Sequence, residues 1–177
     1  PAPTARSGRV GGRMCLGARG ENPRRVNRDE RPKSISKETT FLEDTADPDI
    51  LDGHLWRLSE QVADRAKAKD LAGRTVTLKL KRGDFQLVTR RQSLPGPTQL
   101  TDRIYRAAKA MFDLAGALGP YRLIGVGISE LVAGAQADGS DDLLDPDAAR
   151  RAAVERASDG IRAKFGADAI IRGRALR

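Results

Sequence analysis

Apolar and polar residues alternate along several stretches between residues 33 and 132. The clearest is 74–82, where Val76, Leu78 and Leu80 point one way while threonines and lysines point the other. Strict alternation predicts a strand with one buried and one solvated face. Weaker versions of the pattern predict strands over 33–43, 85–93 and 121–132, with a turn at Gly83-Asp84 that makes the middle pair a hairpin.

Two amphipathic helices are predicted between these strands. The first has its N-cap at Asp47, its first residue at Pro48 and its end near Leu71, before Gly73. The second follows a break in the strand at Pro95-Gly96-Pro97, with Thr98 as its cap, and stops at Gly119-Pro120. Their apolar stripes are spaced by three and four residues and comprise Leu51, Leu55, Leu58, Val62 and Ala66, then Ile104, Ala108, Met111, Ala115 and Leu118.

The order strand, helix, strand, strand, helix, strand predicts an α+β fold, a two-layer sandwich in which both helices cover one face of a four-stranded sheet. We expect this domain over 33–132. The composition of residues 1–32 predicts a basic arm or linker. Residues 133–177 are expected to form an acidic linker followed by a helix from Asp145-Pro146 to Phe165. The thin apolar stripe of that last helix, Val154, Ala157, Ile161 and Phe165, either packs on the domain or remains available to a partner.

The uncovered sheet face is the candidate site. It is expected to carry hydroxyls, cations and glycines, namely Ser34, Ser36, Thr75, Thr77, Lys79, Lys81, Thr89 or Arg90, Arg91, Gly125 and Gly127. These groups suit phosphate oxygens, and the glycines allow close approach of a ligand to the backbone. The aromatic platforms that stack unpaired bases are missing. The face therefore fits the backbone of duplex DNA or, alternatively, is an ordinary solvated surface.

Charge supports a polyanionic partner mainly through the arm. The chain has a formal net charge of +8, and residues 1–37 account for +7, with ten basic and three acidic side chains. Such an arm commonly contacts nucleic acid, although a solvated tail has the same composition.

No catalytic constellation, metal site or cofactor site emerges. His54 is the one histidine and is expected on a helix as a surface or partly buried residue rather than a catalytic base. Cys15 lies in the arm without a neighbouring histidine. Gly125-Val126-Gly127 lies inside a strand rather than before a helix, so it does not predict a phosphate-binding loop.

Three separated motifs, KSISKETTF, TVTLKLKRGDFQLVTRRQSL and YRLIGVGISELV, resemble in order and spacing the little finger domain of the Y-family translesion DNA polymerases, closest to the DinB type. The resemblance covers residues 13–132, and ARGENPRRVNRDERPKSIS resembles the end of the thumb and its linker. It implies a cytoplasmic protein that holds primer–template DNA. The DNA contacts it implies are Ser34, Ser36, Lys79, Lys81, Thr89, Arg90, Arg91, Gly125 and Gly127.

In that family, palm carboxylates bind the two Mg²⁺ ions of catalysis. The corresponding Asp-rich and Ser-x-Asp-Glu motifs are absent from these 177 residues, so we expect no activity without the missing palm, fingers and thumb. Ser140 to Leu144 further resembles a sliding-clamp peptide, with Leu143 and Leu144 as anchors and Ser in place of the usual Gln. The alternatives are a protein-interaction module, a small enzyme of unknown chemistry, or a truncated gene product.

Overall fold

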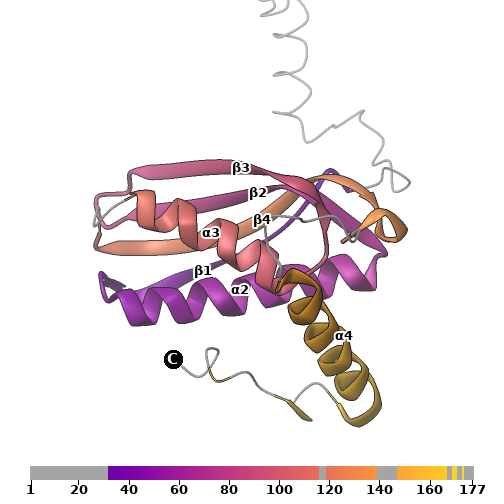
Figure 1. Ribbon diagram of the computed structural model, residues 1–177. Coiled ribbons are helices and arrows are strands. Elements are labelled where there is room, and N and C mark those ends of the chain that lie inside the picture. The colour runs from indigo at the N-terminus through magenta and orange to yellow at the C-terminus, as the bar shows by residue number, and fades with distance from the viewer. Residues whose placement is uncertain (1–31, 116–118, 139–146, 167–168, 171–172, 174–177) are drawn as a thin grey trace, which may run out of the picture. The chain divides into compact units, whose positions relative to one another are not determined.

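The computed structural model describes residues 32–115, 119–138, 147–166, 169–170 and 173. The chain divides into two units, Pro1–Arg31 and Pro32–Arg177, and the described elements belong to the second. They are β1 (Ser34–Thr45), α2 (Pro48–Ala68), β2 (Leu71–Arg82), β3 (Leu87–Thr98), α3 (Thr101–Ala115), β4 (Tyr121–Ala133), η1 (Gly134–Gln136) and α4 (Ala148–Phe165). Figure 1 shows this order.

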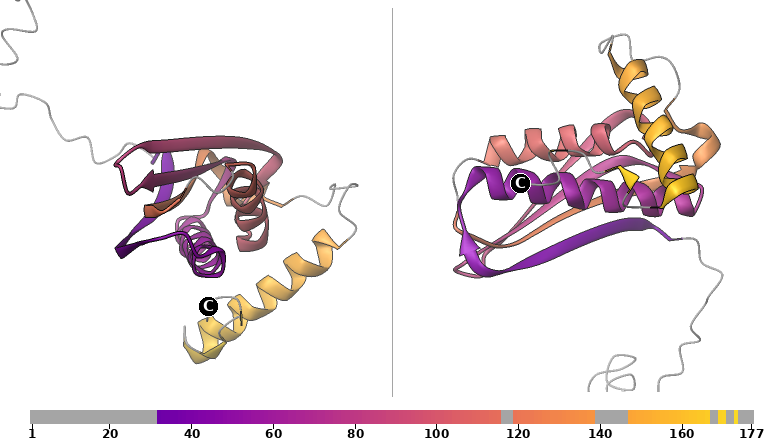
Figure 2. Two further views of the ribbon diagram at one scale, coloured as in Figure 1. Left: turned by 90° about the vertical axis from the view of Figure 1, so that its left-hand side faces the viewer. Right: turned by 90° about the horizontal axis from the view of Figure 1, so that it is seen from below.

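The strands form one antiparallel sheet in the order β1-β4-β2-β3. Helices α2 and α3 lie side by side on one face of it, as Figure 2 shows from two directions. The predicted two-layer α+β fold is therefore confirmed. None of the helices among the described residues is both long enough and apolar enough to cross a membrane.

An aliphatic core lies between the two layers. Val76, Leu78 and Leu80 of β2 and the matching isoleucines and valine of β4 are almost fully buried. They pack against the predicted stripes of α2 and α3 within one cluster. The prediction for the start of α2 is also confirmed, because the Asp47 carboxylate accepts hydrogen bonds from the backbone N–H groups of Asp49 (2.9 Å) and Ile50 (3.4 Å).

Two predicted boundaries around the edge strand were wrong. β3 runs through Pro95-Gly96-Pro97 to Thr98 instead of breaking there. An edge strand tolerates proline, because the missing N–H removes no hydrogen bond from a central ladder. The pairing register also shifts opposite this segment, between Gly73 and Thr75. At the other end, β3 begins at Leu87 rather than at residue 85.

The helix boundaries also differ from two predictions. α2 ends at Ala68, and Gly73 lies inside β2, where an added Cβ would come within 2.6 Å of the Ile128 Cβ. Thr98 does not cap α3, which begins at Thr101; its hydroxyl instead accepts from the Leu100 N–H at 3.0 Å. Leu118 and Asp145-Pro146 lie outside the described residues.

Helix α4 packs on α2 and α3 through charged side chains. Glu155 is 3% exposed and accepts hydrogen bonds from Lys67 Nζ and from the Thr101 backbone N–H, both at 2.8 Å. Lys67 also binds Asp159 at 2.6 Å, and Arg162 of α4 binds Glu60 of α2 at 2.6 Å. A buried carboxylate of α4 thus supplies the partner that the first turn of α3 needs.

The apolar stripe expected on this helix does not pack on the domain. Val154, Ile161 and Phe165 are 54%, 39% and 68% exposed, whereas Ala152 is buried. Of the two alternatives, the structure supports a stripe that remains available at the surface. Polar contacts rather than apolar burial therefore fasten α4 to the domain.

Charge shifts within this contact follow from its geometry. Burial disfavours the charge on Glu155, but Lys67 and Thr101 outweigh burial and lower the pKa of Glu155 below 4.5. Burial likewise opposes the charge on Lys67, but Glu155 and Asp159 outweigh it and raise the Lys67 pKa above 10.5.

These directions predict a pH window for α4 docking. The contribution of Glu155 is present above its unfolded pKa and is lost as the pH falls through its lower folded pKa. That of Lys67 is present below its unfolded pKa and is lost as the pH rises through its higher folded value. In a pH titration followed by NMR, the resonances of 148–165 should shift away from those of the docked helix at both low and high pH. The resonances of the β2 core should not change. Resonances of α4 that stay docked below the folded pKa of Glu155 would contradict this.

Changing Glu155→Ala should loosen α4, because the change leaves Lys67 and the first N–H of α3 without their buried partner. Removing a buried hydrogen bond to a charged group costs about 1.5–3 kcal/mol, so amide exchange in 148–165 should rise roughly tenfold to hundredfold. Val154→Ala, on the exposed stripe, is the matched control and should leave exchange unchanged. Equal exchange in the Glu155 variant and the wild type would show that other contacts hold the helix.

Candidate nucleic-acid interface

Strand pairing arranges the side chains of the uncovered sheet face in four rows. Residues directly opposite each other in antiparallel strands point to the same side of the sheet, and every second residue along a strand shares that side. We call these sixteen residues the open face. Reading from β1 across β4 and β2 to β3, its rows are Ser34-Ser129-Thr75-Ser93, Ser36-Gly127-Thr77-Arg91, Glu38-Gly125-Lys79-Thr89 and Thr40-Leu123-Lys81-Leu87.

The first row consists entirely of hydroxyl side chains. Thr75 and Ser93 lie close enough for a hydrogen bond, with 3.2 Å between their oxygens. Thr75 is only 6% exposed. Ser34, Ser93 and Ser129 are therefore the hydroxyls of this row that can contact phosphate oxygens, and they do so without adding charge.

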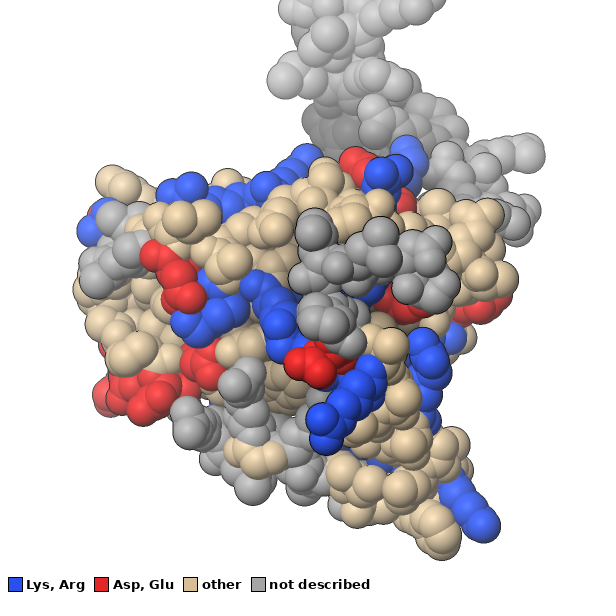
Figure 3. Space-filling view, viewed as in Figure 1, with Lys and Arg blue, Asp and Glu red and all other residues tan. Residues whose placement is uncertain are grey.

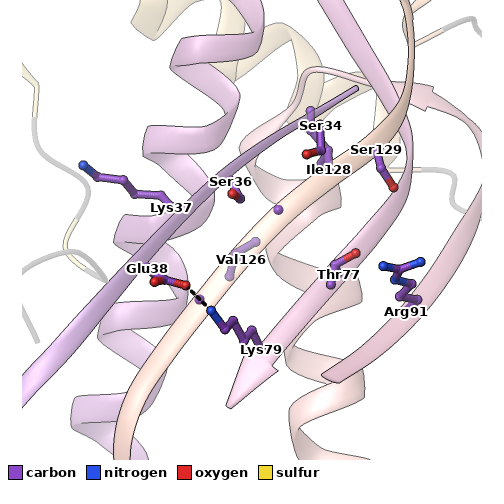
Figure 4. Close-up of a pocket in the computed structure, with 12 residues that line it drawn as sticks. Ser34, Ser36, Lys37, Glu38, Thr77, Lys79, Arg91, Val126, Ile128 and Ser129 are labelled. Atoms are coloured by element: carbon purple, nitrogen blue, oxygen red, sulfur yellow. Dashed lines mark hydrogen bonds and ion pairs between the residues drawn. The ribbon is translucent and has the colours of Figure 1, made fainter. Parts of the chain in front are cut away.

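Residues of the first three rows line a shallow depression of about 230 Å³, drawn in Figure 4. Its floor is β4, where Gly125 and Gly127 have no side chains. A Cβ at Gly127 would lie 2.9 Å from the Ser36 Cβ, and one at Gly125 would lie 3.0 Å from the Glu38 Cβ. The glycines therefore keep the depression open and let β1 lie close beside β4.

An ion pair crosses this depression. Lys79 Nζ of β2 lies 2.7 Å from a carboxylate oxygen of Glu38 on β1, and the dashed line in Figure 4 marks the contact over β4. Both side chains are about half exposed. Glu38 lies two residues beyond Ser36 on β1 and therefore shares its side of the sheet, but the sequence did not indicate that Glu38 would bind Lys79.

The fourth row has mixed character. Lys81 Nζ lies 4.7 Å from the centre of the Phe85 ring, and the Arg122 guanidinium lies 4.6 Å from the same ring. Phe85 is exposed in the turn between β2 and β3, with a positive φ of 67°. Arg122 also pairs with Asp44 at 3.0 Å, so part of the positive charge at this end is already balanced.

Arg90 is the predicted contact that the structure does not bring onto the open face. It pairs opposite Leu78, so it points to the helix side of the sheet, while its neighbour Arg91 pairs opposite Thr77. Arg90 remains exposed because β3 is the edge strand. Figure 3 shows basic side chains along the edge over β3.

The other predicted contacts among the described residues share one face: Ser34, Ser36, Lys79, Lys81, Thr89, Arg91, Gly125 and Gly127. Sequence reasoning missed Ser93 and Ser129. Each lies two residues beyond a predicted contact on its own strand, so strict alternation was the signal that would have found it. Leu143, Leu144 and Cys15 lie outside the described residues.

The described residues contain no group of three or more His, Cys, Asp or Glu side chains arranged to hold a metal ion. His54 lies on α2 with its ring edge-on to Phe41, 4.9 Å between centres. Burial, together with the charge of Arg57, lowers the His54 pKa. Because α2 covers the helix side of the sheet, His54 lies on the side opposite the open face.

Comparison with known proteins identifies the fold's relatives. Residues 32–143 match the family model described as the impB/mucB/samB family C-terminal domain. The chain is 44% identical over 168 residues to DNA polymerase IV 1 of Mesorhizobium japonicum, covering 95% of this chain and 38% of the relative. It is 42% identical to DNA polymerase IV of Brucella melitensis, covering 94% of this chain and 37% of the relative. The chain thus spans somewhat more than a third of these relatives.

A solved structure shows the same fold. A Y-family DNA polymerase chimera of Dbh and Dpo4 superposes with a TM-score of 0.52 at 14% identity, covering 70% of this chain and 36% of the chimera. The predicted resemblance is therefore confirmed. The chain belongs to the impB/mucB/samB family, and its layered domain is the C-terminal domain of that family.

Proposed function

We propose that this domain holds primer–template DNA for a translesion polymerase by laying its open face along the sugar–phosphate backbone. The observation that carries the proposal is the juxtaposition of hydroxyls, cations and bare glycines in the four rows. The names of its relatives, DNA polymerases IV, support DNA as the ligand.

The chemistry of the open face favours sequence-independent binding. Serine and threonine hydroxyls and the Arg91 guanidinium suit phosphate oxygens, which are the same at every base pair. The open face carries no aromatic side chain on which an unpaired base would stack. A duplex backbone is therefore a better fit than a single strand read base by base.

Nucleotide addition requires parts of the polymerase beyond this domain. In the proposed whole protein, Mg²⁺ ions held by another domain would supply the charge stabilisation of phosphoryl transfer. The residues of this chain would position the duplex and resist its dissociation. We retain sliding-clamp binding by Leu143 and Leu144 as a prediction, because both leucines lie outside the described residues.

Arg91→Ala should weaken binding of the chain to a primer–template duplex, because it removes a cation of the open face. Loss of one phosphate contact should lower the slope of log affinity against log salt by about 0.9. Arg90→Ala, the adjacent change on the other side of the sheet, should have a smaller effect. Fluorescence anisotropy titrations between about 50 and 200 mM salt would measure both. A larger effect at Arg90 would contradict the assignment of the open face, and no binding by the wild type would reject the function.

Gly127→Ala should reduce both stability and DNA binding, because the new Cβ meets the Ser36 Cβ at 2.9 Å on the floor of the depression. Overpacking of this kind costs about 1–3 kcal/mol, measurable by urea unfolding. Gly96→Ala is the matched control, since a Cβ there meets nothing within 4 Å. Duplex affinity that is unchanged in the folded Gly127 variant would show that DNA does not contact this part of the sheet.

A further inference from the structure

Glu38 is the single carboxylate among the sixteen residues of the open face. The other charged residues there are Lys79, Lys81 and Arg91, so the formal charge of the face is +2. A surface that only maximised its attraction for phosphates would have no reason to place an acidic side chain near its centre. The position of Glu38 therefore needs an explanation that the proposed grip on DNA does not provide.

The geometry shows what Glu38 does to Lys79. The two residues stand on strands that are not neighbours, with Gly125 of β4 between them in the same row. Because Gly125 has no side chain, the carboxylate and the ammonium group meet over it at 2.7 Å. The row thus carries no net charge, and its lysine is engaged before DNA arrives.

Stability does not account for this pair. Its lysine and carboxylate side chains are 40% and 51% exposed. Ion pairs this exposed contribute little to folding, because water and salt screen them. A phosphate close to this row would meet a repulsive carboxylate, and it would have to compete with that carboxylate for Lys79.

We propose that Glu38 limits the affinity of the open face for the phosphates of duplex DNA by holding Lys79 in an ion pair. This inference rests on the proposed function of the face. A backbone grip that moves along DNA must release phosphates as readily as it binds them, and every additional phosphate contact slows release. The ion pair keeps the Lys79 ammonium group from binding phosphate, so that the duplex is attracted mainly by Arg91 and Lys81 in the rows on either side.

The test is Glu38→Gln in the full 177-residue chain, titrated against a primer–template duplex at several salt concentrations. Freeing Lys79 to bind one more phosphate should steepen the slope of log affinity against log salt by about 0.9. Affinity at about 50 mM salt should rise roughly threefold to tenfold, and that gain should shrink by about threefold at 200 mM. Dissociation measured by stopped flow should slow accordingly.

Two further variants distinguish the effect of breaking the ion pair from the effect of changing the net charge. Lys79→Gln should weaken binding below wild type, because it leaves Glu38 uncompensated on the face. The double variant with both glutamines should return to the salt slope of the wild type, since neither charge remains. Thermal unfolding of all three should match the wild type within a few degrees, as expected for an exposed pair.

Asp113→Asn is the matched control. It also removes a carboxylate from an exposed ion pair, the one with Lys109 on α3, and gives the same net charge far from the open face. It should leave DNA affinity unchanged. Equal gains in the Asp113 and Glu38 variants, or no gain in the Glu38 variant, would overturn the proposal while leaving DNA binding itself intact. A wild type that binds no duplex would reject the proposed function as well.

Discussion

The placement of β4 between β1 and β2 is the constraint on which the rest of this domain depends. Its isoleucines and valine enter the core on one side, and its alternate glycines form the bare floor of the open face on the other. Because the two sides of a strand alternate strictly, a one-residue slip would bury polar groups and expose the core. Packing against α2 and α3 thereby holds the surface rows in register.

The helices on the covered side of the sheet are held in two different ways. Aliphatic burial joins the sheet to α2 and α3, whereas α4 is added to the helix layer through Glu155, Lys67 and Arg162. Buried charged contacts of this kind are costly to break on one side yet add little net stability over an apolar contact. Because the docking of α4 depends on the charges of Glu155 and Lys67, we expect pH to affect this helix more than the sheet. The exposed apolar side chains of α4 lie away from the proposed DNA surface.

The open face has a formal charge of +2, a minor part of the net charge of +8 that the whole chain carries. Most of the excess positive charge lies in residues 1–37, while the described face relies on hydroxyls, two glycines and few cations. The proposed grip thus combines many weak, neutral contacts with limited electrostatic attraction. A surface of that type adapts to any sequence and, with Glu38 in place, remains easy to release.

The sequence by itself determined the elements and their order, because the alternation in β2 and the stripes of α2 and α3 are local periodicities that match one secondary structure each. It also determined which side of each central strand is polar. Only the tertiary structure decided the strand order, the continuation of β3 through Pro95-Gly96-Pro97, and the side of the sheet to which Arg90 points. The meeting of Glu38 with Lys79, and of Glu155 with Lys67, likewise joins residues far apart in the chain. Such contacts depend on pairing and packing between elements, and local periodicity carries no information about them.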